Sequence, residues 1–232
     1  MRYYNKSVIG VLFMNSIATF SKCCSLALGI VLMIVSPRAS ASDNDWQNWS
    51  SISVTTFMTD TVTFIAKPEF RFDDDISRHY YTHMEFGVAW KVTSWLTLSP
   101  CYRHVNQKKS DTWQVEYRPH LNATLGWKLG VLSFKNRSRL EYRIRDSRET
   151  FRYTNKFSVQ FPEYHSIRTY VAVEPFYDFD ASEWNKNRVF AGFDFRVFRH
   201  MKAGLEYVFE STKQNSDWTN SHVIGTSLAF TF

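Results

Sequence analysis

From about residue 46 to the last residue, apolar and polar side chains alternate with a period of two. The alternation is clearest in 62–72, where Phe64 and other apolar side chains take turns with Lys67, Arg71 and other polar ones. A period of two is that of a β-strand, which places successive side chains on opposite faces. Each strand of this chain would therefore have one apolar face and one polar face.

The alternating segments are long, at about 10–15 residues each, which is about twice the usual strand length of a soluble sheet. Strands of this length that are apolar outside and polar inside build a transmembrane β-barrel, because a closed barrel bonds every backbone group without water. The alternative, a soluble periplasmic β-protein, would bury its apolar faces in a shared core and use shorter strands. We therefore predict an all-β fold, an antiparallel up-and-down transmembrane β-barrel.

The alternation places the number of strands at about ten to twelve. Ten segments are clear, and an even count would let the barrel begin and end in the periplasm. The stretch 46–57 resembles an eleventh, which is either a partial, non-spanning strand or one of twelve if a further segment exists. Short turns such as 92–94 and 128–130 would be periplasmic, and the more polar connections that alternate with them would be external. The ten segments are 62–72, 80–92, 95–105, 113–127, 131–145, 151–161, 168–179, 188–197, 201–210 and 222–232.

Aromatic residues are abundant, since 8 Trp, 12 Tyr and 20 Phe make up 17% of the chain. Trp90, Trp127 and Phe161 lie on the apolar register just before short turns, where a transmembrane barrel carries an interfacial girdle. The final alternation ends with Phe230 and Phe232, and it resembles the C-terminal signal that Gram-negative outer-membrane proteins present to their assembly machinery. We therefore expect a bacterial outer-membrane location, with outer-membrane lipids, lipopolysaccharide and that machinery as partners.

The first 41 residues have the organisation of a signal peptide. An uncharged apolar block at 23–35 follows Lys22, and Ala39-Ser40-Ala41 supplies the small residues that signal peptidase accepts. The block is too short to span a bilayer comfortably, and an uncleaved anchor or a buried helix is the alternative. We predict a cleaved signal peptide at 1–41 and a barrel domain at 42–232.

The net charge of the chain does not argue for a nucleic-acid partner. The formal charge is +6, from 28 Lys and Arg against 22 Asp and Glu. Arg2, Lys6, Lys22 and Arg38 lie in the predicted signal peptide, so that the barrel domain keeps a net charge of only +2. Such a small excess gives no bulk attraction to DNA or RNA.

Several short motifs of the barrel domain resemble those of a family of predicted Gram-negative outer-membrane β-barrels of unknown function. The motifs include Lys67-Pro68-Glu69-Phe70-Arg71-Phe72, Cys101-Tyr102-Arg103, Asn136-Arg137-Ser138-Arg139-Leu140-Glu141-Tyr142-Arg143, Glu174-Pro175-Phe176-Tyr177-Asp178-Phe179, and Asn187-Arg188 leading into Phe190-Ala191-Gly192-Phe193. The resemblance covers most of 46–232. It implies an outer-membrane location and no particular activity.

The polar register carries many charges that would line the barrel interior. Arginine predominates, above all in 131–145, where five bases accompany the single carboxylate of Glu141. The residues that we expect in a lumen network or an anion path are Arg71, Arg103, Lys135, Arg137, Arg139, Glu141, Arg143, Glu174 and Arg188.

Three functions are compatible with such a lumen. A structural barrel, or a narrow channel of unknown solute, would use Arg–Glu pairs to brace its wall. An anion-selective porin would use the excess of arginine to attract acidic sugars, phosphates or organic acids. An outer-membrane lipid-modifying enzyme would need a nucleophile within reach of a base.

The sequence contains no recognisable catalytic or metal-binding constellation. His83, His104, His120 and His222 show neither a nucleophile-elbow motif nor metal-ligand spacing. Cys101 is the only cysteine left after the predicted cleavage. We therefore expect no catalytic residue, no metal and no cofactor.

The mature protein should begin near Ser42 and should fractionate with outer membranes, because the leader and the terminal alternation both direct the chain there. N-terminal sequencing of the membrane-bound form measures the cleavage point. A sequence that begins at Met1 or Met14 would contradict the predicted signal peptide.

Overall fold

The computed structural model describes residues 45–232 apart from 111, 147 and 215–216. The predicted signal peptide at 1–41 lies outside the described residues. The described residues form eleven β-strands, and none of them belongs to a helix long and apolar enough to cross a membrane. The strands are β1 Asp45–Phe57, β2 Val62–Asp73, β3 Arg78–Lys91, β4 Leu96–Lys109, β5 Thr112–Leu129, β6 Leu132–Arg145, β7 Arg148–Gln160, β8 Ile167–Asp178, β9 Glu183–Phe198, β10 Met201–Gln214 and β11 Asp217–Thr231.

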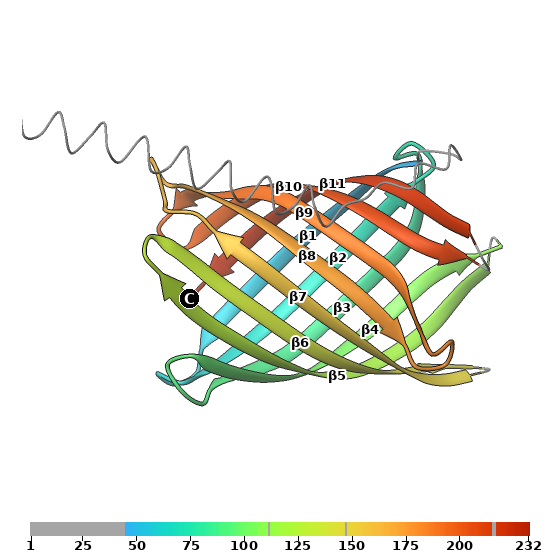
Figure 1. Ribbon diagram of the computed structural model, residues 1–232, viewed down its shortest axis with the longest axis horizontal. Coiled ribbons are helices and arrows are strands. Elements are labelled where there is room, and N and C mark those ends of the chain that lie inside the picture. Colours follow the sequence, from blue (N-terminus) through green and yellow to red (C-terminus); the bar gives the residue numbers. More distant parts are fainter. Residues whose placement is uncertain (1–44, 111, 147, 215–216) are drawn as a thin grey trace, which may run out of the picture. The chain divides into compact units, whose positions relative to one another are not determined.

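The eleven strands close into one barrel in which every strand has two hydrogen-bonded neighbours. Consecutive strands pair antiparallel, and they cross the barrel obliquely (Figure 1). β1 and β11 complete the cylinder as a parallel pair, with registers that run from Asp45 opposite Ser221 to Thr55 opposite Thr231. The predicted all-β, up-and-down transmembrane barrel of about ten to twelve strands is therefore confirmed.

Both alternatives for residues 46–57 are wrong. The segment is neither a partial strand nor one of twelve, because β1 is 13 residues long and pairs along its length with β2 and β11. An even number of strands is required only when the first and last strands pair antiparallel, and here β1 and β11 pair parallel. A parallel pair also bonds its backbone groups, with evenly spaced, slanted hydrogen bonds, so an odd number of strands can close.

The connections fall into two sets at the two ends of the barrel. Those after β1, β3, β5, β7 and β9 lie at the end where the chain finishes, since Phe57 N donates to Phe232 O at 3.0 Å and Thr231 N donates to His200 O at 2.9 Å. At the opposite end, Asp75 N donates to the Asp45 carboxylate at 3.4 Å. We call these the C-terminal end and the opposite end. The assignment of the C-terminal end to the periplasm stays a prediction.

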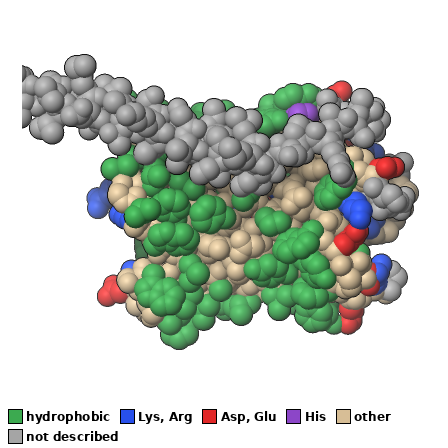
Figure 2. Space-filling view, in the orientation of Figure 1, with side chains coloured by type: hydrophobic (Ala, Val, Ile, Leu, Met, Phe, Trp, Pro, Cys, Tyr) green, Lys and Arg blue, Asp and Glu red, His purple; other side chains and the backbone are tan. Residues whose placement is uncertain are grey.

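The outer wall is apolar, as the alternation predicted. Trp90, Trp127 and Leu140 are 51%, 44% and 46% exposed, and apolar side chains form two large groups near the ends of the visible face (Figure 2). Phe161 differs from the prediction, because it is only 7% exposed and does not belong to an outer girdle. Its backbone N–H donates to Thr169 O at 3.0 Å, which holds it against the start of β8.

The interior is not uniformly polar. Side chains of β1 and β8–β11 form a buried apolar cluster on one side of the lumen. The cluster consists of Trp49, Ala172, Phe190, Val208 and Val223, with Tyr170 packed against it. The remaining interior positions are mostly charged. One side of the lumen wall is therefore apolar, and the rest of the wall is charged.

Two glycines beside this wall make room for an inward carboxylate. A Cβ atom at Gly225 would lie 2.5 Å from Glu206 Cγ, and one at Gly192 would lie 2.8 Å from Glu206 Cβ. The Glu206 side chain therefore lies against glycines of both neighbouring strands, β9 and β11. Its carboxylate accepts a hydrogen bond from the Tyr170 hydroxyl at 2.5 Å.

The substitution Leu140→Arg should lower the free energy of unfolding by about 2–4 kcal/mol, because it places a charge in the middle of the lipid-facing wall. Gln107→Arg should cost less, since this side chain lines the interior. Urea unfolding of the barrel in lipid vesicles measures both values. Equal costs would mean that the inside and outside faces are assigned wrongly.

Candidate functional site: the charged lumen

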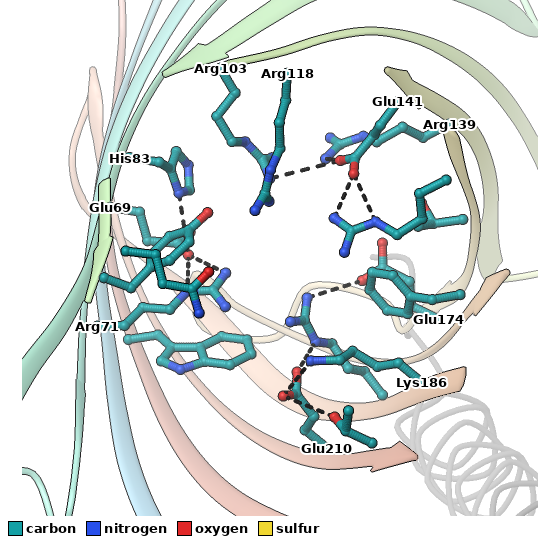
Figure 3. Close-up of a pocket in the computed structure, with 18 of the residues that line it drawn as sticks. Glu69, Arg71, His83, Arg103, Arg118, Arg139, Glu141, Glu174, Lys186 and Glu210 are labelled. Carbon is teal, nitrogen blue, oxygen red and sulfur yellow. Dashed lines mark hydrogen bonds and ion pairs between the residues drawn. The ribbon is translucent and has the colours of Figure 1, made fainter. Parts of the chain in front are cut away.

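The lumen contains a cavity of about 590 Å³, to which all eleven strands contribute side chains. Charged side chains surround its open centre (Figure 3). Eight of the nine lumen residues predicted from sequence line it: Arg71, Arg103, Arg137, Arg139, Glu141, Arg143, Glu174 and Arg188. The ninth, Lys135, does not line the cavity and is exposed near the start of β6, at the C-terminal end of the barrel.

Glu141 is the centre of one group of ion pairs. Its side chain is 2% exposed and accepts from Arg152 at 2.5 Å and from Arg139 at 3.4 Å. Arg103 Nη1 lies 3.9 Å from Glu141, and the Nε and Nη2 atoms of Arg103 donate to Glu85. The register explains this convergence, because inward positions of β4, β5, β6 and β7 follow one another around the wall. Glu141, on β6, therefore connects β7 on one side of its strand with β4 on the other.

Glu69 organises a second group on β2 and β3. Its carboxylate lies 2.6 Å from Arg71 and 3.1 Å from Lys67. His83, which is 2% exposed, lies 3.8 Å away across the β2–β3 pair. The two cations that flank this carboxylate offset the free-energy cost of burying its charge.

A third group joins β6 to β8, β9 and β10. Arg137 binds Glu174 at 2.5 Å, and Arg188 lies 3.9 Å from the same carboxylate. Arg188 also binds Glu210 at 2.5 Å, which Lys186 approaches to 2.8 Å. Arg137–Glu174 joins two strands that are not direct neighbours, whereas the pairs of Arg188 and Lys186 join adjacent strands. Together they brace the wall from β6 to β10.

Guanidinium groups alternate with aromatic rings along the same wall. Arg71 lies 3.8 Å from the centre of Trp49 and 4.5 Å from that of Tyr81. Arg188 lies 4.6 Å from Trp49 and 4.8 Å from Phe176. Such cation–π contacts stabilise a desolvated guanidinium by about 1–2 kcal/mol.

The roles of Trp49, Phe176 and Phe190 were missed by the sequence analysis. None of the three was placed in the lumen by the sequence. The register could have found two of them, since Phe176 shares the inward parity of Glu174, and Phe190 that of Arg188. Lys156 Nζ, 3.4 Å from the centre of the Phe190 ring, is held by the same wall.

Two bases of the Glu69 and Glu174 groups, Lys67 and Arg137, are more accessible to a solute than the bases around Glu141. The side chains of Lys67 and Arg137 are 36% and 31% exposed, whereas those of Arg103 and Arg139 are 12% and 9% exposed. Lys156 lines the cavity and has no carboxylate within 4.0 Å among the described residues. It lies directly opposite Arg137 on the β6–β7 pair.

One trio of side chains has the composition of a metal site. The ligand atoms of Glu85, Cys101 and His120 lie within 4.8 Å of one another. Glu85 already accepts two hydrogen bonds from Arg103. Because that cation occupies the carboxylate, we assign no metal to the trio.

The histidines of the outer wall are associated with tyrosines. His222 Nδ1 lies 2.6 Å from the Tyr207 hydroxyl, and the His104 ring is 5.4 Å from that of Tyr117. In the described part of the chain, neither histidine contacts a serine or cysteine nucleophile by a hydrogen bond. The geometry thus gives no support to a lipid-modifying active site.

A family model described as "Protein of unknown function (DUF2490)" matches residues 46–221. The chain belongs to this family. The predicted kinship with an uncharacterised outer-membrane barrel family is thereby confirmed. Among curated proteins, none matches the chain.

Two solved porins share the barrel fold. The chain resembles the NanC porin with a TM-score of 0.50 and 12% identity, over 81% of this chain and 99% of that one. An anion-selective porin from Comamonas acidovorans is similar with a TM-score of 0.37 and 12% identity, over 76% of this chain and 55% of that one. The first likeness supports the transmembrane barrel fold of this family member.

Glu141→Gln should lower the free energy of unfolding by about 3 kcal/mol, because it leaves buried guanidiniums without their carboxylate. Glu163→Gln is the matched control. Its partner Arg168 lies 2.8 Å away, but both side chains are at least 31% exposed, so the loss should stay below about 1 kcal/mol. Urea unfolding in vesicles measures both, and equal losses would contradict a bracing role for Glu141.

Proposed function

We propose that this protein is a narrow, anion-selective channel of the bacterial outer membrane. The observation that carries the proposal is the charge of the cavity wall, where twelve Lys and Arg accompany seven Asp and Glu. An excess of five positive charges around a lumen with low-dielectric walls attracts anions and repels cations.

The ion pairs and the channel are compatible roles of one lumen. Pairs such as Arg152–Glu141 and Arg188–Glu210 fix side chains against the wall. Because these groups are held there, they leave the 590 Å³ cavity free for water and solute. A passing anion would meet Lys156 without a carboxylate within 4.0 Å among the described residues, and it would meet Lys67 and Arg137 as partly exposed partners of Glu69 and Glu174.

The proposed solutes are acidic sugars and small organic acids. A carboxylate of such a solute can accept hydrogen bonds from a guanidinium in two-point geometry. The aromatic rings of the apolar wall offer a surface for the less polar face of a sugar. The proposed setting includes lipopolysaccharide around the barrel, and an assembly machinery that engages Phe230 and Phe232 at the end of β11.

Planar-bilayer recordings in a KCl gradient test the selectivity. The wild-type barrel should give a reversal potential of the sign expected for anions. The double variant Arg137→Gln/Lys156→Gln should lower the anion-to-cation permeability ratio by about twofold or more, because it removes two facing bases of the cavity wall. Arg148→Gln, which changes a 56% exposed side chain outside the cavity, should leave the ratio unchanged.

A pair of uncharged and charged sugars tests the solute class. Glucuronate should reduce the chloride current at concentrations at which glucose, of similar size, does not. Absence of any current from the wild type would instead favour the purely structural barrel. A cation-selective current would contradict the proposal outright.

A further inference from the structure

The lipid-facing wall carries a polar cluster on β6 and β7. It consists of Asn136, Ser138, Tyr153 and Asn155. These side chains point outward, because their neighbours along the strands, Arg137, Arg139, Thr154 and Lys156, line the cavity inside. The register places Ser138 opposite Asn155, so the cluster is continuous across the two strands.

The cluster is joined by its own hydrogen bonds. Asn155 Nδ2 donates to Asn136 Oδ1 at 2.7 Å and to Ser138 Oγ at 3.0 Å, and it lies 3.4 Å from the Tyr153 hydroxyl. The hydroxyls of Ser138 and Tyr153 are 3.1 Å apart. The Asn155 amide nitrogen thus bonds one oxygen of each of the other three residues.

Aromatic side chains border the cluster along the barrel axis. Toward the C-terminal end, the rings of Trp127, Phe134 and Phe157 pack together, with centroids 5.6–6.2 Å apart. Toward the opposite end, Tyr142 stacks on Phe151 at 4.8 Å. Figure 2 shows the same arrangement on one face, where two apolar groups are separated by a less apolar zone. Because aromatic girdles mark the membrane interfaces, the cluster lies at the depth of the hydrocarbon.

One atom of each of the two amide groups in the cluster has no hydrogen-bond partner among the described residues. Asn136 Nδ2 and Asn155 Oδ1 make no hydrogen bond within the described part of the chain. Lipid tails offer neither donors nor acceptors, so each unpaired group raises the free energy of the isolated barrel. The surface would be more stable against a partner that supplies one donor and one acceptor at the same depth.

We propose that this cluster is the contact surface for a second copy of the chain. Across a two-fold axis, the free Nδ2 of Asn136 would donate to the free Oδ1 of Asn155 in the partner, and the reciprocal bond would form as well. The same patch on both copies is the arrangement that a two-fold dimer requires. A second copy also has the polar groups at the required depth, which a lipid tail lacks.

A second polar patch on the outer wall provides a comparison. Asn48 and Ser50 of β1 lie beside Thr226 of β11. Asn48 Nδ2 donates to Ile224 O at 3.0 Å, and Ser50 Oγ bonds both Asn48 Oδ1 at 2.7 Å and Thr226 Oγ1 at 2.9 Å. Both the nitrogen and the oxygen of the Asn48 amide are thus bonded within the same chain. This patch therefore has no amide atom that a second copy would need to bond.

Energy transfer between two fluorescently labelled populations in lipid vesicles measures the association. The wild type should associate as its density in the membrane rises. The double variant Asn136→Leu/Asn155→Leu should associate about tenfold or more weakly, because both reciprocal bonds are lost. Asn48→Leu is the matched control and should associate like the wild type.

The outcomes separate dimerisation from other causes. Both leucine variants should keep the wild-type melting temperature, since they place apolar side chains toward lipid. A wild type that stays monomeric at every density would overturn the proposal. So would association that Asn48→Leu abolishes and Asn136→Leu/Asn155→Leu leaves intact. Lipopolysaccharide that binds the monomer and is released by the double variant would identify a lipid as the occupant instead. The result is independent of channel conductance.

Discussion

Every backbone N–H and C=O group that lies in lipid must find a partner within the protein, and this requirement organises the whole molecule. It forces the strands into a closed ladder, in which β1 has to bond β11 as well as β2. Closure gives each strand one face toward lipid and one toward the lumen. The charges at membrane depth then point into the lumen, where most of the carboxylates bind a base.

The inward charges meet this second demand with pairs that cross the lumen wall. Arg137 and Glu174 are 37 residues apart in sequence, and yet they are joined at 2.5 Å. Glu141 and Glu210 each bind more than one base. Pairs of this kind stabilise the barrel only as a set, because the loss of one member leaves a buried charge behind. The set leaves a cavity and an excess of positive charge, so rigidity and anion selectivity arise from the same residues.

Sequence reasoning succeeded wherever the alternation was regular. It placed ten strands within a few residues of their observed bounds, and it put Arg71, Arg103, Glu141 and their partners inside, because parity alone decides which way a strand residue points. The inward positions of Trp49 and Phe190 were not predicted, because the polar character of a barrel interior was the only criterion for an inward side chain. Sequence reasoning also could not pair the charges, because which base reaches which carboxylate depends on register and tilt.

The parallel pair of β1 and β11 has a consequence for how this barrel could be extended. Asp45 and Phe232 lie at opposite ends, so a link between them would have to run the full height of the barrel. At about 3.3 Å per residue, such a link would be as long as a strand. Placed between β1 and β11, it would be antiparallel to both and would replace one parallel pair with two antiparallel ones. This junction is therefore where the cylinder could gain a strand without reversing any other, and where an eleven-stranded and a twelve-stranded barrel differ by a single insertion.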